Sequence, residues 1–305
     1  MNKDIVIDVY NKRSAKYQIF RDIQHYIRFF INKDAIKINF LFYDIVIQFE
    51  DYKDCVVFKQ KTNKDFINKL KHNIENYRNK YSKSFNNNFC INGRQDKIIN
   101  RFKIISGVDD IHSDNLKLFY NKSSLEKFKI FEDTLYITFQ NGHGLGQYKG
   151  NHIKCWDIQK WDELLYLLKT YLPNNIKIVQ VGLDGYVFDK ADFKLAGKTN
   201  FDELCSILKK SILHIDADCG CVHIAKALGT TSVVLFGPTD ANYIGYDNNI
   251  NVMSSICGNC FEVISSTAKC PLGYSKPLCM QSISPQFVFS KVIEYLKTKN
   301  IIKNK

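Results

Sequence analysis

The sequence predicts an α/β protein whose second half is built on a parallel, doubly wound sheet. From residue 134 onward, strand-like and helix-like segments alternate, which is the pattern of such sheets. Thirteen of the 15 glycines and all five prolines also lie after residue 140. The first part is instead rich in Lys, Asn, Ile and Phe. We therefore expect two domains, 1–133 and 134–305, of which the first is the less regular.

The elements of the second half follow from apolar periodicity and from capping residues. Trp161, Leu164, Leu165 and Leu168 form the apolar stripe of one helix. Another helix should start after Thr199 or Asn200, either of which suits an N-cap. We expect strands at 135–140, 176–181, 212–215 and 232–236, helices at 201–210, 222–228 and 285–297, and a long loop after 236.

The first half is less clear. Two β-branched runs, 4–9 and 43–49, indicate buried strands, and 17–30 and 66–77 have the apolar spacing of helices. Only two glycines, Gly93 and Gly107, occur before residue 140.

Size and charge limit the classes of function. A chain of 305 residues with 45% hydrophobic residues can bury a core, which excludes wholesale disorder. The net charge of +12 indicates an anionic partner such as a phosphate ester, a nucleic acid or a membrane surface. We expect no nucleic acid, because the basic residues lack regular aromatic interleaving. Without an apolar run of roughly 18 residues or a secretory signal, we place the chain in the cytoplasm, where it could visit the inner membrane surface.

The segment 214–239 is predicted to bind an anionic ligand. A buried strand runs into Asp218, Cys219 and Gly220, and a helix follows at once. The amides of Cys219, Gly220 and Cys221, backed by the positive helix end, would suit a phosphate or pyrophosphate. Asp218 could bind a sugar hydroxyl, with His223 one turn into the helix. The alternative is that Asp218 caps the helix and His223 packs in the core.

Thr239 is the last residue of this candidate site. It follows Gly237 and Pro238 at the end of the next strand, where a ligand on the same sheet edge would be reached.

These residues carry a family resemblance. D-C-G-x-x-H-I-A-x-A-L-G from Asp218, followed by V-x-L-F-G-P-T, resembles the motif of glycosyltransferase family nine, the heptosyltransferases. The resemblance implies a GT-B-like fold of two Rossmann-like domains, of which the N-terminal one is here reduced or truncated. Cys219 stands where the family has Ser or Thr, which keeps the backbone amide but removes a hydroxyl donor.

Two further matches extend the resemblance. Lys154, two residues before Trp156, is similar to the family lysine that contacts the donor phosphate, which implies a catalytic role in neutralising the departing diphosphate. The alternative is a solvated surface lysine. Asp184, after a strand ending at Gly182, resembles the acidic residue that holds the nucleotide ribose, although an Asp in a turn would also suit this position.

Four of the ten cysteines have metal-ligand spacing. Cys257, Cys260, Cys270 and Cys279 lie in a segment, 257–279, rich in turn residues. Four thiolates would hold structural zinc or iron in a closed tetrahedral site. Free thiols and disulfides are the alternatives. The spacing resembles, in general form, the iron-binding cysteine segment of autotransporter heptosyltransferases.

The resemblance implies an inverting glycosyltransferase. Its donor would be a nucleotide-sugar, with ADP-heptose the first choice, and its acceptor the lipopolysaccharide core, a lipid-linked saccharide or a protein. The family's glycine loop, which supplies a general base, is not found in residues 1–130. Asp8, Asp44 and Asp51 are weak substitutes at predicted strand ends. A catalytically incomplete donor-binding or assembly protein of the same fold is therefore the alternative.

Overall fold

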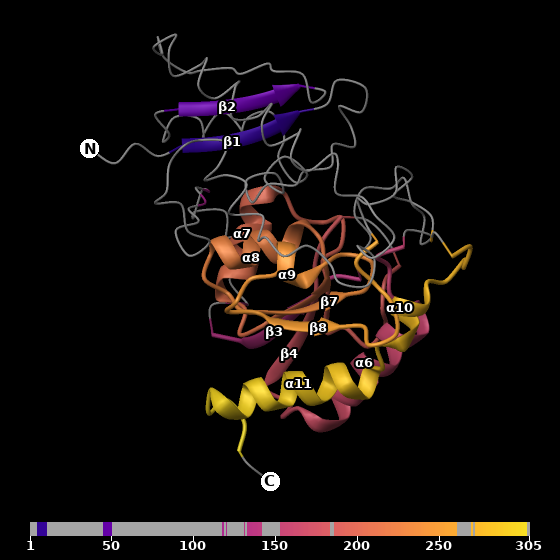
Figure 1. Cartoon of the computed structure of the whole chain (residues 1–305). Coiled ribbons are helices and arrows are strands. Elements are labelled where there is room, and N and C mark those ends of the chain that lie inside the picture. The colour runs from indigo at the N-terminus through magenta and orange to yellow at the C-terminus, as the bar shows by residue number, and fades with distance from the viewer. Residues whose placement is uncertain are drawn as a thin grey trace.

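The computed structural model describes the backbone of 5–10 and 45–50 and, in the rest of the chain, residues 118, 120, 131, 133–141, 153–183, 186–260, 270 and 272–303. In the first half, β1 (Ile5–Tyr10) and β2 (Ile45–Glu50) pair in parallel as a two-stranded sheet of their own (Figure 1). Both predicted strands are thereby confirmed, each displaced slightly toward the C-terminus. The predicted helices 17–30 and 66–77 lie outside the described residues.

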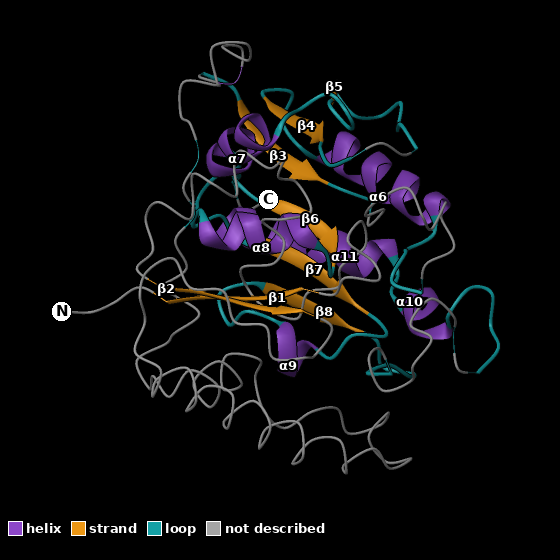
Figure 2. Ribbon diagram, turned by 90° about the horizontal axis from the view of Figure 1, so that it is seen from above, coloured by secondary structure: helices purple, strands orange, loops and turns teal. Residues whose placement is uncertain are grey.

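The second half is built on a six-stranded sheet in which every neighbouring pair is parallel. The strands lie in the order β5-β4-β3-β6-β7-β8 (Figure 2). Their bounds are β3 Leu135–Phe139, β4 Ile176–Gln180, β5 Phe193–Lys194, β6 His214–Ala217, β7 Ser232–Phe236 and β8 Ile250–Met253. The α/β fold class is confirmed.

The order of the strands reverses between β3 and β6. The chain builds outward from β3 through β4 to β5 and then returns to the other side of β3 with β6, β7 and β8. In open parallel sheets, ligands bind beyond the carboxyl ends of the strands at such a reversal. The loops after β3 and β6 are therefore the first place to look for a site.

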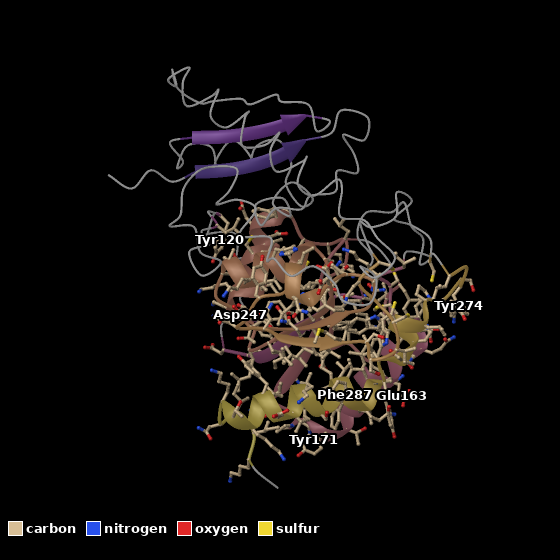
Figure 3. All side chains as sticks on the ribbon, viewed as in Figure 1. Tyr120, Glu163, Tyr171, Asp247, Tyr274 and Phe287 are labelled. Atoms are coloured by element: carbon tan, nitrogen blue, oxygen red, sulfur yellow. The ribbon has the colours of Figure 1, made fainter. Side chains whose placement is uncertain are left out.

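Helices cover both faces of this sheet (Figure 1). α7 and α8 lie over one face, and α6 and α11 cover the other and pack together. Among the labelled residues of Figure 3, Glu163 and Tyr171 belong to α6 and Phe287 to α11. The bounds are α6 Ile158–Tyr171, α7 Phe201–Lys210, α8 Gly220–Ala227, α9 Ala241–Ile244, α10 Leu278–Ser282 and α11 Pro285–Thr298.

The helix ends follow the local sequence. Asn200 accepts a hydrogen bond from the Glu203 amide, and the Glu203 carboxylate accepts one from the Asn200 amide, so α7 begins with a capping box. Ser284 caps α11 ahead of Pro285, which sits at the first helical position. The apolar stripe of α6, from Trp161 to Leu168, is fully buried. The three helices predicted from these signals are confirmed.

The two faces of the sheet differ in chemistry. Toward α6 and α11, β3 and β6 present Ile137, Phe139 and Ile215, which belong to the main apolar core. Because side chains alternate along a strand, the neighbouring residues point to the other face. Under α7 and α8, these two strands and the residue after β3 place a set of polar side chains, each at most 2% exposed: Thr138, Gln140, His214 and Asp216.

Some elements differ from the prediction. β6 begins two residues later than expected, and α8 begins at Gly220 rather than at 222. β5, with two residues, is too short to show a period, and the predicted long loop after 236 contains α9 and the edge strand β8. None of the helices in the described part of the chain has the length and apolarity needed to cross a membrane.

Candidate functional site

The carboxyl edge of the sheet gathers most of the predicted site residues. Asp218 and Cys219 directly follow β6, Gly220 opens α8, and Thr239 lies in the turn after β7. Asp218 and Thr239 are both buried. Since β6 is next to β3, this group lies where the strand order reverses.

Lys154 reaches this edge from the segment before α6. Its Nζ lies 2.6 Å from Asp218 Oδ2, and the two side chains are only 17% and 4% exposed. Its chain segment is anchored by Trp156, whose indole Nε1 donates to the Ile283 carbonyl and whose ring packs edge-on against Trp161. Lys154 is therefore a positioned, ion-paired cation, and the alternative of a solvated surface lysine is wrong.

Asp218 is held in its charged form. Burial alone would raise the pKa of this carboxyl, but the Lys154 ammonium brings the pKa below its ordinary value. The Thr239 hydroxyl lies close to Asp218 and also favours the charged carboxylate. Among the described residues, it makes no hydrogen bond of good geometry. The N-cap of α8 is Cys219, so the alternative in which Asp218 caps the helix is wrong.

His223 lies on α8 and contacts Tyr246. Its Nδ1 is 2.7 Å from the Tyr246 hydroxyl, and the two rings meet edge-on. Burial lowers the pKa of His223 to about 4, although nearby Asp218 acts in the opposite direction. The imidazole is therefore neutral near pH 7 and adds a hydrogen-bonding group, but no charge, next to the Lys154–Asp218 pair.

The thiols of the loop between β6 and α8 point into the protein. Cys219 Sγ donates to Asp216 Oδ2, and Cys221 Sγ donates to Gln140 Oε1, each at 2.7 Å. Cys219 has the extended backbone of an N-cap but makes no side-chain cap. The loop therefore presents its backbone and Gly220, rather than the cysteine side chains, at this edge, and the predicted anion site on its amides stays a prediction.

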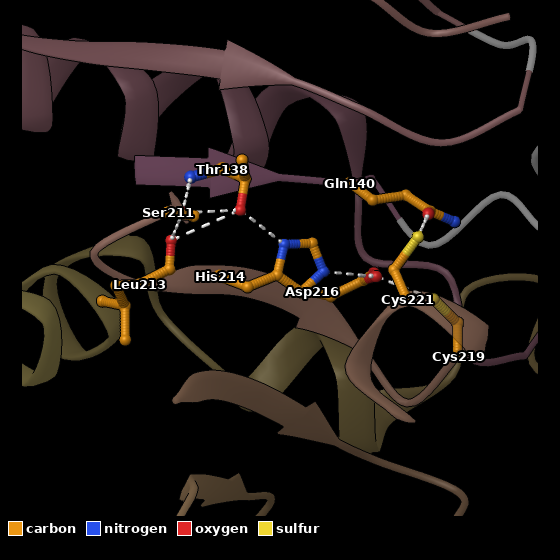
Figure 4. Close-up of polar contacts among 8 residues, drawn as sticks. All are labelled: Thr138, Gln140, Ser211, Leu213, His214, Asp216, Cys219 and Cys221. Atoms are coloured by element: carbon orange, nitrogen blue, oxygen red, sulfur yellow. Dashed lines mark hydrogen bonds and ion pairs between the residues drawn. The ribbon is translucent and has the colours of Figure 1, made fainter. Parts of the chain in front are cut away.

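A buried polar network beneath this loop was not predicted (Figure 4). His214 contacts Thr138 through Nδ1 at 3.0 Å and Asp216 through Nε2 at 3.2 Å. Burial raises the pKa of Asp216 well above its ordinary value. The available signal was a histidine and a carboxylate within one buried strand, but Thr138, which contacts His214, and Gln140, which contacts Cys221, lie in or directly after β3, more than 70 residues away.

The cysteine-rich segment is partly assembled. Cys279 is buried, and burial together with neighbouring Cys257 and Cys260 raises the pKa of its thiol to about 12. Among the described residues, however, the one group of metal-ligating atoms within 4.8 Å of one another is His214, Asp216 and Cys221. The four-cysteine metal site therefore stays a prediction.

The segment also touches the candidate site. A Cβ on Gly237, which precedes Thr239 by two residues, would lie 2.4 Å from Met280 Sδ and 3.1 Å from Cys279 Sγ. The Asn259 amide donates to the Gly237 carbonyl at 3.3 Å.

The other predicted residues remain untested. Asp184, Asp44 and Asp51 lie outside the described residues. Asp8 is the fourth residue of β1, so it stands within the strand rather than at its end.

Comparison with solved structures found several similar chains. The chain is similar to the E. coli ADP-heptose lipopolysaccharide heptosyltransferase II, with 18% identity over 60% of this chain and 54% of that one, and a TM-score of 0.44. It is also similar to the iron-containing dodecameric glycosyltransferase TibC from enterotoxigenic E. coli H10407, with 14% identity over 56% and 48% of the two chains, and a TM-score of 0.46. The chain thus spans about half the length of these two proteins.

A third solved structure covers more of the chain. The family 9 glycosyl transferase from Veillonella parvula DSM 2008 has 14% identity over 98% of both chains and a TM-score of 0.49. No curated protein matches the chain. The family model of glycosyltransferase family 9 (heptosyltransferase) matches residues 146–270. This segment contains Lys154, the loop from β6 to α8 and Thr239, so most of the candidate site lies in the part of the chain that is similar to glycosyltransferase family 9.

Proposed function

We propose that the protein is an inverting glycosyltransferase that binds a nucleotide-activated sugar, ADP-heptose, at the carboxyl edge of β3 and β6. The observation that carries this proposal is the 2.6 Å contact between Lys154 and Asp218, beside the N-terminus of α8 and inside the family 9 segment. An ammonium group, backbone amides and a helix N-terminus together suit a diphosphate. The neighbouring carboxylate suits a sugar hydroxyl.

Lys154 supplies the charge that the reaction needs. As the bond between sugar and diphosphate breaks, negative charge grows on the leaving phosphate, and a fixed cation stabilises it most in a site shielded from water. Asp218 holds this ammonium in place. When the donor binds, the ammonium turns to the phosphates and Asp218 accepts hydrogen bonds from sugar hydroxyls.

The loop and its neighbours hold the rest of the donor. The amides of Cys219, Gly220 and Cys221 bind the pyrophosphate, and Asp184 holds the ribose. Neutral His223 donates a hydrogen bond without competing with Lys154 for the phosphate charge. Thr239, whose hydroxyl is buried at the same edge, completes the donor pocket.

The first domain, 1–133, would hold the acceptor. We propose a saccharide of the lipopolysaccharide core, lipid-linked at the inner membrane surface, or a protein as this acceptor. An inverting enzyme requires a base near the acceptor hydroxyl, and Asp8, Asp44 and Asp51 remain its candidates.

We also propose that Cys257, Cys260, Cys270 and Cys279 hold one structural zinc or iron ion. Support comes from the proximity of the Cys257, Cys260 and Cys279 thiols. Such an ion would brace the segment that packs on Gly237 near the donor pocket. Metal analysis of reductively purified protein tests this proposal, and the Cys257→Ser/Cys260→Ser variant is its control.

A transfer assay tests the proposed activity. Incubation with ADP-heptose and a core saccharide or autotransporter acceptor should release ADP, and Lys154→Ala should reduce turnover at least about 100-fold. The second candidate function is donor binding without transfer, which the lack of a glycine loop in residues 1–130 favours. Binding of ADP-heptose without turnover would select that second function.

A further inference from the structure

The buried network beneath the donor loop has the composition of a metal site. We infer that His214, Asp216, Cys219 and Cys221 form a zinc site that fastens the loop between β6 and α8 to the sheet. Ligand atoms of His214, Asp216 and Cys221 lie within 4.8 Å of one another and are buried. Cys219 Sγ, at 2.7 Å from Asp216 Oδ2, is the fourth group. One imidazole, one carboxylate and two thiolates make a set that zinc accepts in tetrahedral geometry.

The hydrogen bonds around His214 orient it as a ligand. The Ser211 hydroxyl donates to the Leu213 carbonyl at 2.7 Å, so its oxygen is left to accept from the Thr138 hydroxyl at 2.9 Å. Thr138 Oγ1 in turn accepts from His214 Nδ1. This chain places the proton of a neutral imidazole on Nδ1 and leaves the lone pair of Nε2 facing Asp216, as in histidines that bind metals.

That lone pair faces a carboxylate oxygen. Nε2 of His214 and Oδ2 of Asp216 lie 3.2 Å apart, and both side chains are completely buried. With the imidazole proton on Nδ1, this contact is held by the carboxyl proton, and a cation could take the place of that proton. The other carboxylate oxygen, Oδ1, has no hydrogen-bond partner in the described part of the chain, although burying a polar atom without a partner is costly. A cation at this point would satisfy both residues.

Gln140 contacts one of the proposed sulfur ligands. Its Oε1 accepts from the Cys221 thiol, while its buried Nε2 lacks a partner among the described residues. Reversal of the amide would direct Nε2–H at a Cys221 thiolate, which is the way ligating sulfurs are commonly stabilised.

Binding is an exchange of protons for zinc. The ion displaces one proton each from Asp216, Cys219 and Cys221, so about three protons leave per ion. The resulting site carries a net charge of about −1, because three anionic ligands surround a divalent ion, and it lies at the positive N-terminal end of α8.

The experiment uses the full-length Cys257→Ser/Cys260→Ser variant as background, so that the cysteine-rich segment does not contribute. Zinc titration against a competing chelator should give about one ion per chain, with about three protons released, read from the buffer dependence of the calorimetric heat. X-ray absorption of this zinc-loaded protein should show two sulfur ligands and two lighter ones. These measurements leave the four proposed ligands intact.

Variants in the same background identify the ligands. Asp216→Asn and Cys221→Ala should each weaken zinc binding at least about 10-fold, the effect typical of lost ligands or their supports. Cys205→Ala is the matched control, because Cys205 is equally buried on α7 but lies outside the group, and it should leave the affinity unchanged. The proposal would be overturned by less than about 0.1 zinc per chain or by a shell of four sulfurs. It would also be overturned if the folded Asp216→Asn and Cys221→Ala variants bound zinc as tightly as the background protein does.

Discussion

The two faces of the six-stranded sheet differ in chemistry although the same strands form both. Toward α6 and α11, β3 and β6 contribute Phe139 and Ile215 to a continuous apolar core. Toward α7 and α8, they contribute buried Thr138, His214 and Asp216. The apolar face stabilises the fold through burial alone. The polar face carries a desolvation cost that only paired groups offset, which indicates a role beyond stability.

The largest expected effect lies on the apolar face. Ile215→Ala should lower the free energy of unfolding by about 3 kcal/mol, because a fully buried side chain is replaced by a partial cavity. Urea denaturation measures this change. The folded variant should bind ADP as the parent does, and a selective loss of ADP affinity at unchanged stability would contradict the division between the two faces.

The ion pair at the sheet edge comes next. Lys154→Ala should cost about 3 kcal/mol of stability, since it leaves the nearly buried Asp218 carboxylate without its cation. In the Lys154→Ala/Asp218→Asn double variant, much of this loss should return. Denaturation of the four proteins of this cycle gives the coupling free energy, and strictly additive effects would show that the pair does not interact.

The polar face should also make stability depend on pH. The native state keeps His223 neutral down to about pH 4, whereas an unfolded histidine takes up a proton near pH 6.5. Stability should therefore fall as the pH drops from about 6.5 to about 4. Relative to His223→Gln, the parent should lose about 2 kcal/mol between pH 7 and pH 4.5. Parallel stability curves for the two proteins would show that His223 is not the group responsible.

The smallest effect is expected at Asp216 without metal. Burial raises the pKa of Asp216 well above its ordinary value and so favours the uncharged carboxyl, which an Asn side chain resembles in shape and polarity. Asp216→Asn should therefore change stability by less than about 1 kcal/mol. In the Cys257→Ser/Cys260→Ser background, zinc should stabilise the protein that keeps Asp216 and should not stabilise the protein that also carries Asp216→Asn. Thermal denaturation with and without zinc measures this difference. An equal rise of the melting temperature in both proteins would place the ion elsewhere.

The sequence predicted elements whose signals are local. Asn200 and Glu203 predict the start of α7, and the apolar stripe from Trp161 predicts α6. Both signals can be read from the sequence because a helix cap and a helical period involve only residues that are close in the chain. β5 and β8 escaped prediction, since two residues show no period and an edge strand with exposed Met253 lacks a continuous buried run.

In the candidate site too, local motifs were predicted from the sequence, whereas contacts between distant residues were not. Lys154 and Asp218 stand in recognisable motifs, but their 2.6 Å contact joins residues 64 positions apart and is decided by the fold. The network around His214 was missed because the register between β3 and β6, which pairs Thr138 with His214, cannot be deduced from either strand alone.

Calorimetric titration of the full-length chain with ADP, for the parent and Lys154→Ala at equal ionic strength, tests the central claim most directly. A lysine that faces the diphosphate contributes a charge-assisted contact. The parent should therefore bind one ADP per chain, and Lys154→Ala should bind ADP at least about 10-fold more weakly. Lys160→Ala is the control, because it removes another partly buried lysine of the same region, and it should bind ADP like the parent. No binding by the parent, or equal affinity in the parent and Lys154→Ala, would contradict the account.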